Sequence, residues 1–161
     1  MFSPLWAALA LSLAVGQNSD PRAALVGTWR VQEEIDTRAD GSVVSVIPQG
    51  YVGMLIYTSD GFVSGTLMPR ARAWAVGSAT ADQMRETIET GTAYTGRFEV
   101  DPKSHTVTHI IVSSMDPSDE GQRLSRTYVL DGDALALSGK WSYRNESLGF
   151  TIKFTRVKPE P

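Results

Sequence analysis

The sequence predicts an all-β fold, an antiparallel up-and-down barrel of about eight to ten strands with one short helix. Segments in which apolar and polar residues alternate recur from Thr28 to Arg156, and short turns separate them. Successive hairpins need no crossover connection, so the sheet is expected to be antiparallel. A long sheet with one apolar face buries that face by closing on itself, which favours a barrel.

Turn signals define the order of the strands. Asp40-Gly41 and Asp60-Gly61 predict tight hairpins, and Asp131-Gly132 predicts a further turn. The predicted strands cover residues 28–35, 42–47, 52–58, 62–68, 92–100, 106–114, 124–130, 134–138 and 150–156, and a further segment, 141–144, is expected to pair locally.

One helix is predicted, from Thr80 to Thr90. Thr80 is a suitable N-cap, and Gly91 follows the last residue as a stop signal. The apolar positions Met84 and Ile88 are four residues apart and form a narrow stripe. Such a helix is suited to lie across the mouth or the wall of a barrel.

The N-terminus resembles an export signal. The uncharged run Leu5–Val15 is too short to span a bilayer, which needs about 20 apolar residues, and fits a secretory signal. Ala14-Val15-Gly16 supplies small residues for cleavage before Gln17, although Met1–Pro4 carries no Lys or Arg. A misassigned start codon or a disordered arm are the alternatives. We therefore expect a secreted or periplasmic protein with a signal peptide at 1–16, a linker at 17–24 and a barrel domain at 25–158.

Composition limits the partners. The net charge is −3 and no run of Lys or Arg occurs, so no nucleic-acid partner is predicted. No membrane span is predicted either. The chain has no cysteine, which excludes thiolate metal sites, and we predict neither a metal nor a cofactor.

Several motifs together resemble the bacterial and fungal lipocalin-like domain family. They are Gly27-x-Trp29 in the first strand, the hairpin Gly53–Gly61, the run Tyr94-x-Gly96-x-Phe98-x-Val100, and the segment from Arg126 to Leu137. The match covers roughly Leu25 to Val157. The resemblance implies a small calycin-type β-barrel with a small hydrophobic ligand, and it implies no catalytic mechanism.

Trp29 and Arg156 are expected to close one end of the barrel. Each residue alternates in phase with the apolar residues of its strand, so both side chains should point inward. In lipocalins a late arginine packs over the first-strand tryptophan, and such a cation–π contact is worth about 0.5–2 kcal/mol. We interpret this pair as a structural plug, with a ligand contact as the alternative.

Polar residues on inward strand faces suggest a cluster. Glu33, His109 and Arg126 each alternate in phase with apolar neighbours, and a buried arginine needs a partner. Together they would form either a structural salt bridge or a polar floor that orients a ligand carboxylate or carbonyl. His109 alone could be a hydrogen-bonded core residue, a ligand anchor or a general acid/base. Metal ligation is poorly supported, because the other histidine, His105, lies in a turn.

Large aromatic residues complete the candidate site. They either pack as ordinary core or line an apolar pocket, since a wide barrel need not be filled by side chains. The predicted ligand-binding residues are Glu33, Tyr57, Tyr94, Phe98, His109, Arg126 and Tyr128.

The function predicted is therefore binding of a small hydrophobic molecule inside the barrel. The main alternative is an isomerase or cyclase for a hydrophobic secondary metabolite, in which His109 or Arg126 polarises one oxygen of the substrate. A third possibility is an interaction module whose barrel is filled and holds no ligand. Fold alone does not separate these functions.

Overall fold

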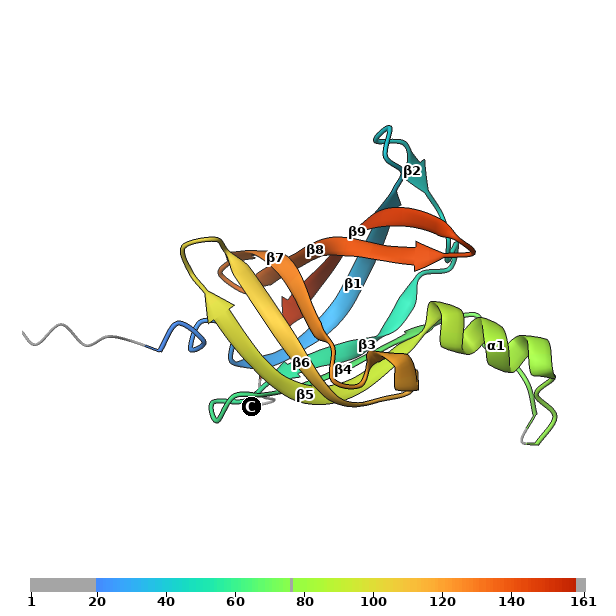
Figure 1. Cartoon of the computed structure of the whole chain (residues 1–161), viewed down its shortest axis with the longest axis horizontal. Helices are drawn as coiled ribbons and strands as arrows, with labels where there is room; N and C mark the ends of the chain where they lie inside the picture. The colour runs from blue at the N-terminus through green and yellow to red at the C-terminus, as the bar shows by residue number, and fades with distance from the viewer. Residues whose placement is uncertain (1–19, 76, 159–161) are drawn as a thin grey trace, which may run out of the picture.

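The computed structural model describes residues 20–75 and 77–158. Its strands close into an antiparallel barrel (Figure 1). Eight strands form the ring in the order β1-β3-β4-β5-β6-β7-β8-β9, and β9 pairs with β1 to close it. A short strand, β2, extends the other edge of β1. The strands are β1 (Gly27–Thr37), β2 (Val43–Val44), β3 (Tyr51–Tyr57), β4 (Phe62–Pro69), β5 (Thr92–Asp101), β6 (Thr106–Ser114), β7 (Arg123–Asp131), β8 (Ala134–Tyr143) and β9 (Glu146–Arg156). The predicted fold class is confirmed. The predicted signal peptide and its cleavage site before Gln17 lie outside the described residues.

The predicted helix is present as α1 (Ala81–Thr90) and lies at one end of the barrel (Figure 1). Thr80 caps it through a reciprocal pair of bonds with Gln83, in which each side chain accepts from the other residue's backbone N–H. Within α1, only Thr90 is buried, and Met84 and Ile88 are 51% and 45% exposed. The apolar stripe of the helix therefore faces solvent in this structure. A 3₁₀ turn, η1 (Pro117–Asp119), precedes β7.

The second half of the barrel differs from the prediction. Strand β8 runs without interruption through residues 139–143, and β9 begins at Glu146, so the two strands form one long hairpin. Its turn consists of Arg144 and Asn145, which have φ angles of 45° and 67°. Two positive φ values define a type I′ turn, but the usual glycine is missing, so this turn has no clear signal in the sequence. The predicted strand 42–47 is also shorter, because only Val43–Val44 pairs with β1.

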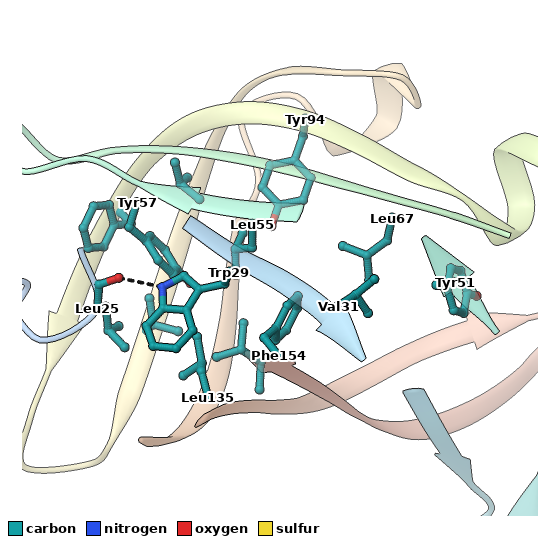
Figure 2. Packing of buried hydrophobic residues seen from close by; sticks show 14 of the residues in the cluster. Leu25, Trp29, Val31, Tyr51, Leu55, Tyr57, Leu67, Tyr94, Leu135 and Phe154 are labelled. Atoms are coloured by element: carbon teal, nitrogen blue, oxygen red, sulfur yellow. Dashed lines mark hydrogen bonds between the residues drawn. The ribbon is translucent and has the colours of Figure 1, made fainter. Parts of the chain in front are cut away.

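The end opposite α1 is filled by apolar side chains, and we call it the closed end. Trp29 is fully buried there, packed near Leu135 and Phe154, and its indole N–H donates to the carbonyl of Leu25 at 2.8 Å (Figure 2). The guanidinium carbon of Arg156 lies 4.0 Å from the centroid of the Trp29 ring. The predicted contact between these two residues is therefore present.

Backbone carbonyls hold Arg156 in place over the indole. Its Nη1 donates to Val26 at 2.6 Å, and its Nη2 donates to Ala24 at 3.0 Å. Gly27 has a φ of 138°, and a Cβ there would come within 2.7 Å of Nη1. Glycine in the Gly-x-Trp motif thus leaves the space that the arginine occupies.

Candidate functional site

The end of the barrel next to α1 is open and contains a cavity of about 500 Å³, which we call the open-end cavity. Strand residues supply most of its wall, and the last turn of α1 contributes Ile88 and Thr90 at the rim. A cavity of this size matches those that hold small organic ligands. Its wall mixes apolar side chains with a few charged ones: Glu34, Tyr51, Leu67, Arg126, Trp141, Phe150 and Ile152 are among its residues.

A β-bulge in β1 decides which acidic residue faces this cavity. The pairing of β1 with β9 shifts between Val31 and Glu33, so Gln32 is an extra residue and the inward phase of the strand changes. Glu33 consequently points outward, is exposed, and accepts from Lys153 at 2.8 Å. The prediction that Glu33 faces inward and pairs with Arg126 is wrong. Glu34 lines the open-end cavity instead.

Two carboxyl groups enter the barrel after the bulge. Burial raises the pKa of Glu34 to about 8, with a further contribution from the nearby Asp36 carboxylate and an opposing hydrogen bond from Tyr51. Asp36 is 3% exposed, and burial raises its pKa too, while the indole N–H of Trp141 donates to its Oδ1 at 2.9 Å and opposes that shift. At neutral pH the Glu34 carboxyl is therefore mainly protonated in the ligand-free cavity.

Arg126 is one of three cationic side chains that line the cavity, with Arg123 and Lys140. Its Nη1 donates to the carbonyl of Leu124 at 3.1 Å, and its guanidinium carbon lies 5.9 Å from the centroid of the Phe150 ring. Among the described residues, no carboxylate forms a salt bridge with it. Gly139 makes room for this arrangement, because a Cβ there would meet the Phe150 ring at 2.8 Å. Arg126 thus has no carboxylate salt-bridge partner in the part of the chain that the structure describes.

His109 lies behind Arg126, in the packed part of the barrel, and is fully buried. Its Nε2 and Nδ1 are each 2.7 Å from a phenolic oxygen, that of Tyr57 and that of Tyr94 respectively, and Arg126 Nη1 is 3.4 Å from Nδ1. Because an arginine only donates, Nδ1 is best assigned as the acceptor and Nε2 as the donor to Tyr57. Burial, with the Arg126 charge as a smaller cause, holds the pKa of His109 well below its usual range. The imidazole is therefore neutral.

The predicted aromatic residues pack as core. The rings of Tyr57 and Phe98 are 4.6 Å apart, and burial raises the pKa of both Tyr57 and Tyr94. The ring of Tyr94 lies against Gly65, where an added Cβ would come within 2.8 Å of it. Tyr128 is half-buried beside His105, with ring centroids 5.7 Å apart.

Of the predicted ligand-binding residues, Arg126 lines the open-end cavity and the others do not. His109 acts on the cavity only through Arg126, so a general acid/base at His109 would not reach a molecule held there. The residues that sequence reasoning missed are Glu34, Asp36 and Tyr51. Gly139, a glycine inside a strand, was a usable signal for close packing on the inner face.

Comparison with known proteins identifies the family. A family model described as a lipocalin-like domain matches residues 26–154. The chain belongs to this lipocalin-like family. A search of curated proteins found no match. Within this lipocalin-like chain, Trp29 lies inside the matched range and Arg156 lies two residues beyond its end.

Two further findings concern this lipocalin-like domain between residues 20 and 158. None of the described helices is both long and apolar enough to span a bilayer. No group of three or more His, Cys, Asp or Glu side chains among the described residues is arranged to hold a metal ion.

Proposed function

We propose that this lipocalin-like protein binds a small, mainly apolar molecule in the open-end cavity and anchors one of its oxygens at Arg126. The observation that carries the proposal is a guanidinium on the wall of a cavity of about 500 Å³ with no described carboxylate partner. A ligand carboxylate or carbonyl would supply that partner.

Apolar walls and a polar anchor have different roles in this proposal. Leu67, Phe150 and Ile152 offer apolar area, from which most of the binding energy of such a ligand would come. Arg126 would fix the orientation of the ligand, because a guanidinium can donate two parallel hydrogen bonds to one carboxylate. His109 and Tyr94 support Arg126 from behind as positioning residues.

Export to the periplasm or the exterior is part of the proposal. Its support is the uncharged run Leu5–Val15 with small residues before Gln17. N-terminal sequencing of the protein isolated from its own host is the test. A mature chain that starts near Gln17 is expected, and an intact Met1 on a cytoplasmic product would contradict export.

Binding can be tested with decanoate and with a neutral apolar fluorophore, N-phenyl-1-naphthylamine. The Arg126→Met variant keeps most of the side-chain volume and removes the charge. We expect it to weaken decanoate binding by about ten-fold or more, the effect of losing a charge-assisted bond, and to change binding of the fluorophore much less. Arg30→Met, on the exposed outer face of β1, is the matched control and should change neither. Equal decanoate affinity in the Arg126→Met variant and the wild type would contradict the anchor.

A further inference from the structure

We propose that Glu34, with the aromatic side chains of Tyr51 and Trp141, forms a second polar subsite that binds the ammonium group of the ligand, and that the buried Asp36, bonded to Trp141, adds negative charge to it. The ligand class would then be an amine-bearing amphiphile. The inference deepens the proposed function and rests on it for the open-end cavity being a ligand site. It does not depend on Arg126.

The first step is the position of the carboxyl groups. After the bulge at Gln32, Glu34 and Asp36 occupy successive inward positions of β1. Glu34 lines the cavity together with Tyr51 from β3 and Trp141 from β8, so three strands converge on one part of the wall. The subsite is therefore built from side chains that the barrel holds in place.

The second step is what these carboxyl groups lack. Asp36 is 3% exposed, its Oδ1 accepts the indole N–H of Trp141, and no buried polar side-chain atom among the described residues lacks a hydrogen-bond partner, so what is absent here is a cation. Neither Glu34 nor Asp36 forms a salt bridge in the described part of the chain. Buried carboxyl groups normally have a cationic partner or a full set of donors. A ligand ammonium would supply both a positive charge and N–H donors.

The third step is the aromatic wall. Indole and phenol faces attract cations through their ring quadrupoles, and this attraction is strongest where water is excluded. Trp141 and Tyr51 both line the cavity beside Glu34. A carboxyl group that shares the cavity wall with Tyr51 and Trp141 favours an ammonium over a second anion or a hydrocarbon.

The two polar subsites lie on different walls of the cavity. Glu34 is on β1 and Arg126 is on β7, three steps apart around the ring through β9 and β8. Phe150 on β9 pairs with Asp36 in the strand register, and its ring centroid lies 5.9 Å from the guanidinium carbon of Arg126. An oxygen at Arg126 and an amine at Glu34 can therefore belong to one extended molecule.

The other charged and titratable groups around the subsite do not neutralise Glu34. Asp36 on its own strand repels it, and Tyr51 on β3 donates to it. The same cavity is also lined by the cations Arg123, Arg126 and Lys140 and by the acidic residues Glu89, Asp116 and Asp119, and in the described part of the chain none of these cations forms a salt bridge with Glu34.

The raised pKa of Glu34, about 8, gives the subsite a distinctive pH dependence. An ammonium requires the ionised carboxylate, so its binding near neutral pH releases the Glu34 proton. Affinity for an amine should then rise as pH increases toward 8, by up to about ten-fold per unit for one released proton. A ligand hydroxyl or carbonyl that accepts from the protonated carboxyl would show the opposite trend.

The experiment measures binding of decylammonium and decanol to the full chain between pH 6 and pH 8.5 by isothermal titration calorimetry. We expect decylammonium affinity to rise with pH in the wild type and to fall by about ten-fold or more in Glu34→Gln at pH 8.5. Decanol affinity should not rise with pH, because its hydroxyl gains nothing from the ionised carboxylate that the protonated carboxyl does not offer. Glu33→Gln, one residue away on the outer face, is the matched control and should behave as the wild type.

Asp36→Asn is a second variant, expected to weaken decylammonium binding in the same direction, and circular dichroism checks that each variant is folded. Decylammonium affinity that is unchanged in both variants, or that falls as pH rises, would overturn the inference. If decanoate binds through Arg126 but Glu34→Gln leaves decylammonium affinity unchanged, this inference fails and the proposed function stands. If neither decanoate, decylammonium nor the neutral fluorophore binds, the proposed function fails with it.

Discussion

Charged residues at the two ends of this barrel differ in whether the protein supplies their partners. At the closed end, Arg156 lies on the Trp29 ring and donates to two backbone carbonyls, and its Nε lies 3.5 Å from a carboxylate oxygen of Asp133. At the open end, Arg126 and Glu34 face a cavity, and among the described residues neither has a partner of opposite charge.

This difference separates residues that stabilise the fold from residues that are available for binding. A charge whose bonds are all satisfied within the protein contributes to stability and has little left for a ligand. A buried charge without a protein partner lowers the stability of the fold, and a bound ligand that pairs with it raises that stability again. Variants at the closed end should therefore change unfolding, and variants at the open end should change binding and pH dependence.

The largest effect on stability is expected for Trp29→Ala. Removing a fully buried large aromatic side chain typically lowers the free energy of unfolding by about 3–5 kcal/mol, whereas Trp141→Ala at the half-buried cavity wall should cost less. Denaturant titration measures both. Arg156→Ala should cost less than Trp29→Ala and should be non-additive with it, because the two residues share one contact. Additive costs in the double-mutant cycle would contradict the plug.

The next effect is the pH dependence contributed by Glu34. Its pKa is about 8 in the folded protein against 4.5 as the ordinary value, so the folded state binds more protons between these values and stability falls as pH rises through this window. Glu34→Gln cannot ionise, and it should raise the free energy of unfolding at pH 9 by roughly 2–3 kcal/mol after allowance for partial solvent access, with little change at pH 4. Urea titrations at both pH values test this. An equal effect at both would show that Glu34 is not buried.

A smaller effect on stability is expected for Tyr94→Phe. Tyr94 lies in the packed core and contacts His109, which in turn contacts Arg126 of the open-end cavity. The variant removes one of the two phenolic partners of His109 while keeping the ring against Gly65. Loss of one buried hydrogen bond should cost about 1–2 kcal/mol. Decanoate affinity should also fall by a few-fold, since Arg126 loses support from behind. Unfolding and binding are measured on the same preparation, and unchanged values for both would remove His109 and Tyr94 as positioning residues.

The smallest effect is expected at the exposed contact between α1 and the β8–β9 hairpin. Glu86 accepts from Arg144 at 2.9 Å and from the hydroxyl of Tyr143 at 3.3 Å. Surface ion pairs are usually worth about 0–1 kcal/mol, so Glu86→Gln should lower the free energy of unfolding by no more than that. Thermal unfolding at low and high salt measures it. A loss of several kcal/mol would mean that α1 is an integral part of the barrel.

The fold was largely predictable because its signals are local. Asp-Gly pairs set the first hairpins, Thr80 and Gly91 set the helix limits, and Gly27-x-Trp29 indicated the closed end. The turn at Arg144 and Asn145 was not predictable in this way, because its positive φ angles occur without glycine. The result was a long hairpin where two shorter strands were expected.

The candidate site was less predictable for a physical reason. Strand phase assigns a face only while the pairing is regular, and one extra residue at Gln32 exchanged Glu33 for Glu34. Phase also does not distinguish an inward side chain that packs from one that borders a cavity. Tyr57 and Phe98 point inward and pack together, whereas Arg126 points inward and reaches the open-end cavity.

The most direct test of the account is fluorine NMR of protein labelled with 5-fluorotryptophan. Trp29 reports on the closed end, Trp141 on the open-end cavity, and Trp74 on the exposed surface outside it. Single Trp→Phe variants assign each signal, including that of Trp6, the fourth tryptophan of the sequence. Addition of decanoate should shift the Trp141 signal saturably and leave Trp29 unchanged, with the shift weakened in Arg126→Met. A saturable shift of Trp29 or Trp74 with none at Trp141 would contradict a ligand site at the open end.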